Sequence, residues 1–122
     1  MSSRDWIFRI QDILAAIEKI ETYIEGMTAT QFKKNNLVID AVIRNIEAIG
    51  EASKSIPTNI RRQYPDIPWD QMSGMRNVLI HEYFGVDVTT VWHTAKKYLP
   101  LLKKQLIAIL LEKEKLSFKL KI

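Results

Sequence analysis

Apolar residues recur every three or four positions along most of this chain, which is the spacing of one face of an α-helix. The first stripe consists of large residues separated by four, three, four, three and four positions: Trp6, Ile10, Ile13, Ile17, Ile20 and Ile24. Alternation of apolar and polar residues, which would indicate a β-strand, is limited to the last seven residues. The sequence therefore predicts an all-α protein.

Caps and prolines indicate where the first helices begin and end. Asp5 is expected to cap the first helix and Gly26 to end it. A second helix is expected from near Thr30 to Ser55, and its inward face would consist of Phe32, Ile39, Val42, Ile43, Ile46, Ile49 and Ser53. Three prolines follow, with room for a short helix around 58–64 between the first two and a new helix starting near Pro68 and ending near Gly85.

The last predicted helix starts after Asp87, which can cap it. Its inward positions would be Val88, Val91, Trp92, Ala95, Leu99, Leu102, Leu106 and Ile109. Pro100 falls inside this pattern and predicts a kink or break near 96–99. The end of the chain is expected to fray. We therefore expect one domain over residues 1–122, an antiparallel bundle of about five helices with a charged tail from about residue 112.

The composition limits the classes of function that this chain can have. The 122 residues include no cysteine and only two histidines, so a thiolate or zinc site is disfavoured and no metal or other cofactor is expected. No apolar run approaches the ~20 residues of a membrane span, and the N-terminus lacks the order of a secretory signal, so a cytoplasmic location is expected. The net charge of +4 suits a polyanionic partner. The alternative is that lysines near the C-terminus only keep a tail in solution.

The segment Arg-Asn-Val-Leu-Ile-His-Glu-Tyr, residues 76–83, concentrates reactive side chains more than any other part of the chain. Arginine binds phosphate as a planar fork, and an unperturbed imidazole titrates near neutral pH. On a helix, Asn77 and His81 fall on one stripe, but Arg76 and His81 are about 140° apart. The arginine must therefore reach around the helix, or the substrate must be held between two copies of it.

A dimer is favoured by the neighbouring apolar residues. Met75, Val78 and Leu79 are expected to form the core face of the motif helix. Ile80 and Phe84 would then be an apolar patch among polar motif residues, which suits the interface of a symmetric homodimer.

The motif Arg-Asn-x-x-x-His-x-Tyr resembles the signature of HEPN-domain proteins, specifically the HepT-like ribonuclease toxins of toxin-antitoxin pairs. The resemblance extends in the same order through Ile49-Gly50-Glu51-Ala52, Ile67-Pro68-Trp69, Gly74-Met75-Arg76-Asn77 and His81-Glu82-Tyr83-Phe84. It implies a helical homodimer with a basic cleft at the interface. It also implies a metal-independent endoribonuclease that cuts RNA, including tRNA. A small nucleotidyltransferase of the MntA type would neutralise the toxin by adding AMP to the motif tyrosine, which is Tyr83 here.

The chemistry of metal-free RNA cleavage assigns roles within the motif. His81 is the candidate for proton transfer and Arg76 for binding the phosphate. Asn77 can orient the imidazole or bind RNA, and Tyr83 can stack on a base or bind phosphate. Glu51 either approaches the cleft or pairs on the surface. An alternative function is a non-catalytic HEPN module that binds substrate or nucleotide for a partner nucleotidyltransferase.

Overall fold

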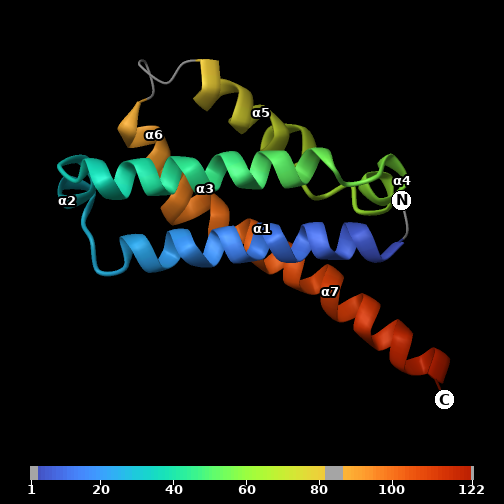
Figure 1. Ribbon diagram of the computed structural model, residues 1–122. Helices are drawn as coiled ribbons and strands as arrows, with labels where there is room; N and C mark the ends of the chain where they lie inside the picture. Colours follow the sequence, from blue (N-terminus) through green and yellow to red (C-terminus); the bar gives the residue numbers. More distant parts are fainter. Residues whose placement is uncertain (1–2, 82–86, 122) are drawn as a thin grey trace.

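The computed structural model describes the backbone of residues 3–81 and 87–121, and the side chains of residues 5–75 and 87–115. These described residues form helices and contain no strand, which confirms the all-α prediction. Helix α1 (Ser3–Ile24) and helix α3 (Asn36–Lys54) lie side by side and run in opposite directions, joined through the short α2 (Ala29–Lys33) (Figure 1).

The second half of the chain covers this pair. The short α4 (Thr58–Gln63) lies at the end of the bundle opposite α2, and α5 (Trp69–His81) packs against α3 (Figure 1). Helix α6 (Val88–His93), a π-helical turn η2 (Thr94–Tyr98) and α7 (Leu99–Lys121) follow one another without interruption. Helix α7 contacts α1, and its C-terminal part extends beyond the rest of the bundle (Figure 1).

The core forms where the predicted stripes meet. All six residues of the first stripe, from Trp6 to Ile24, are buried in α1. The predicted inward residues of α3 are buried as well, and they face both α1 and α5 because α3 lies between these helices. Periodicity alone therefore identified the buried faces of the two central helices.

The prediction of one helix from Thr30 to Ser55 is wrong, because two helices occupy this stretch. Thr28 and Gln31 form a capping box that starts α2, with each side chain accepting a hydrogen bond from the other residue's backbone N–H. The Asn35 side chain then accepts a hydrogen bond from the Val38 N–H at 3.1 Å and starts α3. The chain bends between these caps, and Phe32 still reaches the core.

The ends of α1 also differ in part from expectation. Asp5 is not the cap: α1 begins at Ser3, and Asp5 lies in its first turn, where a carboxylate interacts favourably with the helix dipole. Gly26 does end the helix region, with a φ of 74° that other residues rarely adopt.

The last helix begins as predicted. Asp87 is the N-cap of α6, and its carboxylate accepts a hydrogen bond from the Thr89 N–H at 2.9 Å. The expected irregularity before Pro100 is the π-helical turn at 94–98. The expected fraying is wrong, because α7 continues to Lys121. Strong helix formers fill this region, and the ammonium of Lys113 lies 5.7 Å from the Trp6 ring centroid.

Within the described ranges 3–81 and 87–121, none of the helices has the length and apolar character required to cross a membrane.

Candidate functional site

The motif found in the sequence lies mainly on α5. Arg76, Asn77 and His81 belong to the second half of this helix, and only the backbone is described at these three positions. Tyr83, Phe84 and the expected helix end at Gly85 lie outside the described residues. The structure thus places three of the four predicted site residues within six positions of one helix, where they follow a well-anchored first turn.

Trp69 anchors the start of α5. Its indole is buried and donates a hydrogen bond from Nε1 to the backbone oxygen of Tyr64 at 3.0 Å. The Pro68 carbonyl accepts the first helical hydrogen bond, from the Met72 N–H at 3.0 Å. Because Pro68 fixes its own φ, the direction in which α5 leaves the loop is restricted. These contacts orient the helix that carries the motif.

The buried part of α5 includes residues beyond the predicted core face, and of that face only Met75 can be checked; it packs partly against the core. Trp69 and Met72 are buried, whereas Met75 is only half-buried. The part of α5 that meets α3 therefore includes positions 69 and 72. The other two residues of the predicted core face, Val78 and Leu79, have no described side chains.

A cavity of about 370 Å³ lies beside the first half of α5. Helix α5 contributes Gln71 and Met75, and the remaining walls come from the last helical segment: His93, Thr94, Lys97, Tyr98 and Leu101. The Tyr98 hydroxyl donates a long hydrogen bond to Gln71 Oε1 at 3.5 Å, and burial raises the pKa of Tyr98. The cavity thus offers an imidazole, an ammonium and a protonated phenol next to the motif helix.

The π-helical turn supplies three of these lining residues. Its widened turn is closed by a hydrogen bond from the Leu99 N–H to the Thr94 carbonyl, five residues back. Pro100 explains the irregularity, because it has no N–H to donate and its ring clashes with the carbonyl four residues earlier. The proline was visible in the sequence, but the placement of Thr94 and Lys97 against α5 was not, since it depends on contact between distant segments.

The structure also places Trp92 and Glu51, two other residues that the sequence singled out. Trp92 is half-buried and packs against Phe32, with ring centroids 5.1 Å apart, as expected for a residue bordering the core. Glu51 is exposed on α3.

Known proteins with similar sequences point to one class. The family model described as "Ribonuclease HepT-like" matches residues 13–109, a range that contains all four predicted site residues. "Putative RNase MJ0125" of Methanocaldococcus jannaschii is 44% identical over 93% of this chain and 98% of its own length. "Putative RNase MJ1216" of the same organism is 45% identical over 86% of this chain and 87% of its own length.

"Probable ribonuclease HepT" of Thermococcus cleftensis is 47% identical over 77% of this chain and 86% of its own length. No solved structure matches the chain significantly. The helical bundle and the motif on α5 define the class as a HEPN-type helical protein with the features of a ribonuclease. The family match and the identities make the assignment narrower: the chain belongs to the HepT-like ribonuclease family.

Proposed function

We propose that this protein is a metal-independent endoribonuclease and the toxin of a toxin-antitoxin pair, with RNA, in particular tRNA, as its substrate. The observation that carries the proposal is the match to the HepT-like ribonuclease family over a range that includes the whole motif. The Lys97 and His93 side chains beside α5 add support, because they place basic groups next to the motif helix, where a polyanion would bind. The protein would act in the cytoplasm.

The proposed chemistry is internal transesterification of RNA. The ribose 2′-oxygen attacks the adjacent phosphorus, its proton passes to a base, and the 5′-oxygen of the next nucleotide leaves with a proton from an acid. His81 acts in proton transfer, since imidazole exchanges protons near neutral pH. Arg76 holds the phosphate and balances the charge that develops on its oxygens. Asn77, one turn before His81, positions the imidazole or the RNA.

The cleft would be formed by a homodimer. Positions 76 and 81 are about 140° apart around a regular helix, and α5 is helical throughout 69–81. A phosphate held between two copies of α5 can be contacted by the arginine of one copy and the histidine of the other. Ile80 and Phe84 are the residues we assign to the apolar part of this interface.

The first prediction concerns cleavage itself. Purified protein is expected to cut tRNA in the presence of EDTA. The variants His81→Ala and Arg76→Ala are each expected to lower kcat by about a hundredfold or more, because general acid-base catalysis and charge stabilisation contribute factors of this size. The measurement is the rate of product formation on a denaturing gel, with thermal unfolding as the control for folding. Full cleavage by His81→Ala would remove that residue from the mechanism, and an inactive, unmodified wild type would favour the non-catalytic binding module.

The same variants test the dimer. Mixing the inactive His81→Ala and Arg76→Ala proteins under conditions of subunit exchange is expected to restore part of the activity, because hybrid dimers contain one intact arginine and one intact histidine. Light scattering supplies the independent measurement. A strictly monomeric protein at micromolar concentration would eliminate the shared cleft.

The second prediction concerns inhibition. We propose that a nucleotidyltransferase antitoxin of the MntA type adds AMP to Tyr83, which places a bulky anion where RNA phosphate would bind. Wild type incubated with such an enzyme and ATP is expected to gain the mass of AMP and lose RNA cleavage, whereas Tyr83→Phe is expected to gain no mass. Intact mass before incubation shows whether the site is already occupied. Equal AMP addition to Tyr83→Phe would move the modification to another residue.

A further inference from the structure

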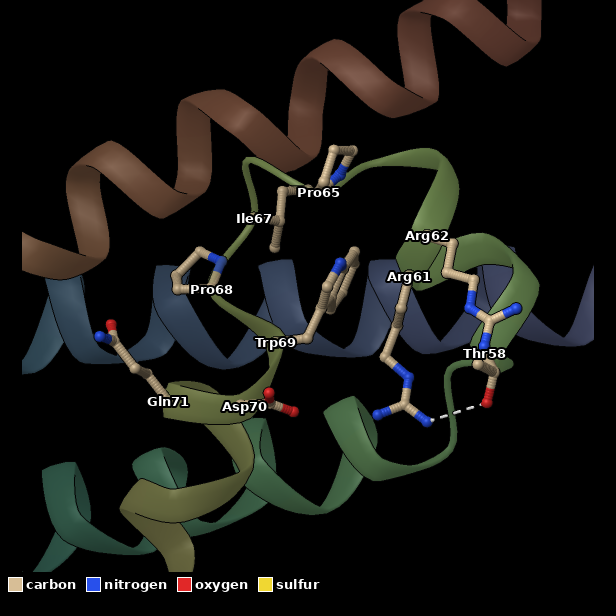
Figure 2. A pocket seen from close by; sticks show the side chains of 9 residues that line it. All are labelled: Thr58, Arg61, Arg62, Pro65, Ile67, Pro68, Trp69, Asp70 and Gln71. Carbon is tan, nitrogen blue, oxygen red and sulfur yellow. Dashed lines mark hydrogen bonds between the residues drawn. The ribbon is translucent and has the colours of Figure 1, made fainter.

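A second cavity lies at the beginning of α5, away from the motif. It measures about 520 Å³ and lies between α4, the loop of residues 64–68 and the first turn of α5 (Figure 2). Helix α4 contributes Arg61 and Arg62, and α5 contributes Asp70 and Gln71. Nothing in the proposed reaction uses this cavity.

Neither arginine has a carboxylate partner among the described residues. Arg9 pairs with Asp12, and Lys103 pairs with Glu21, each at 2.9 Å. Among residues 5–75 and 87–115, by contrast, no ion pair joins Arg61 or Arg62 to any acid, Asp70 included. Two adjacent positive charges therefore line the same cavity, and neither is in an ion pair with a carboxylate of the described residues.

Arg61 shows a second unusual feature. One of its terminal nitrogens donates a long hydrogen bond to the Thr58 hydroxyl at 3.4 Å (Figure 2), but its Nε is buried and has no acceptor among the described residues. A buried donor without an acceptor costs about 1–3 kcal/mol, more for a charged group, so such groups normally have a partner. The terminal nitrogens of Arg61 have only the long bond to Thr58 among the described residues, so an anion in the cavity would supply them with stronger acceptors.

Phosphate is the anion that these groups fit best. A guanidinium presents parallel N–H groups that match two phosphate oxygens, and a second guanidinium from the next residue adds charge. Pro65 and Pro68 lie within the loop and limit its backbone freedom, so the cavity is largely preorganised. Its volume falls within the range of about 300–1,000 Å³ typical of small-ligand sites.

The position of the cavity relates it to the motif. Asp70 lines the cavity, and positions 77 and 81 follow it by seven and eleven residues, which places all three on one stripe of a regular helix. At 1.5 Å per residue, position 77 lies about 10 Å along α5 from Asp70 and position 81 about 16 Å. An RNA strand following this stripe would reach the arginines with a phosphate that is distinct from the one that is cleaved.

We infer that Arg61 and Arg62 form a subsite for a flanking phosphate of the RNA substrate. This inference rests on the proposed function, because it assumes that RNA binds along α5. The subsite would increase affinity and fix the direction of the strand, and it would take no part in proton transfer. Asp70 opposes phosphate in this cavity and would moderate the affinity.

The third prediction tests this subsite by RNA binding. The test uses the His81→Ala protein, which would bind RNA without cutting it. Adding Arg61→Gln together with Arg62→Gln is expected to weaken tRNA binding about tenfold. The slope of log affinity against log salt is expected to fall by about one, because one phosphate contact is lost. Fluorescence anisotropy over a salt series measures both quantities. Asp70→Asn is expected to have the opposite effect and raise the affinity.

The chain offers a matched control. Lys33 and Lys34 are also adjacent exposed cations at the end of a short helix, and α2 lies at the opposite end of the bundle from α4 (Figure 1). Lys33→Gln with Lys34→Gln removes the same charge and is expected to change the affinity by less than about twofold. Because Arg61 is partly buried, Arg62→Gln alone is the variant to use if the double variant unfolds.

The outcomes separate the subsite from the proposed function. In otherwise wild-type protein, the arginine variants are expected to raise KM for tRNA. If wild type cleaves tRNA but the arginine and lysine pairs lower affinity equally, the subsite is wrong and the nuclease stands. If wild type does not cleave but its RNA binding depends on the arginine pair, the nuclease is wrong and the phosphate site stands.

Discussion

At the scale of single residues, Trp69 has the clearest structural role near the motif. It is buried against the core, and its indole hydrogen bond to Tyr64 ties the first turn of α5 to the end of α4. The loop between these helices also forms a wall of the cavity lined by Arg61 and Arg62, which we call the arginine cavity. Trp69 therefore fixes the position of the helix that carries the motif, and it also lines the cavity that we assign to a flanking phosphate.

Two glycines give a prediction at this scale. Gly26 has a φ of 74° and Gly74 lies inside α5, and among the described residues no heavy atom lies within 4 Å of a Cβ added at either position. The space available for a Cβ is therefore the same at both glycines, and only their backbone conformations differ. Gly26→Ala is expected to destabilise by about 1–2 kcal/mol, and Gly74→Ala to stabilise by about 1 kcal/mol.

Urea unfolding of both variants measures these free energies. Equal signs for the two substitutions would show that backbone conformation is not the deciding factor. A loss of stability in Gly74→Ala alone would indicate that another surface, such as a second copy of the chain, comes close to α5.

At the scale of elements, the last helix gains its direction from an irregularity and a cross-link. The π-helical turn before Pro100 joins α6 to α7, and it brings Lys97 and Tyr98 to the cavity beside α5. Farther along, Lys103 of α7 donates a hydrogen bond to Glu21 of α1 at 2.9 Å. This ion pair connects residues far apart in the sequence and holds α7 against α1.

The Lys103 ion pair predicts a pH dependence of stability. The hydrogen bond to Glu21 raises the pKa of Lys103 above its ordinary value of 10.5, although partial burial lowers it. A raised pKa in the folded state means that the pair stabilises fully below pH 10.5 and that this contribution disappears as pH rises through the folded-state pKa. Lys103→Met is expected to cost less than about 1 kcal/mol at pH 7, because both side chains are partly exposed.

The measurement is the difference in unfolding free energy between wild type and Lys103→Met as a function of pH. This difference is expected to shrink above pH 10.5. Lys104→Met, which removes the next lysine of α7, is the control for charge alone. A difference that stays constant from neutral to strongly alkaline pH would show that the ion pair does not contribute.

At the scale of the whole molecule, α3 is the central element, since it packs against α1 on one side and α5 on the other. This arrangement leaves the stripe of α5 that contains Asp70 on the side away from the buried Trp69 and Met72. The arginine cavity opens at one end of that stripe, and the motif occupies the other half of the helix. The proposed dimer would bring the motif halves of two α5 helices together.

The sequence alone determined the helical fold, the buried stripes of α1 and α3, the Asp87 cap and the irregularity before Pro100, because each depends on residues only a few positions apart. Its motif also indicated the family that the comparisons establish. Only the tertiary structure decided which stripe of α5 is buried and that Arg61 and Arg62 line a cavity without a carboxylate partner among the described residues. These features depend on how helices distant in sequence pack, which local spacing does not specify.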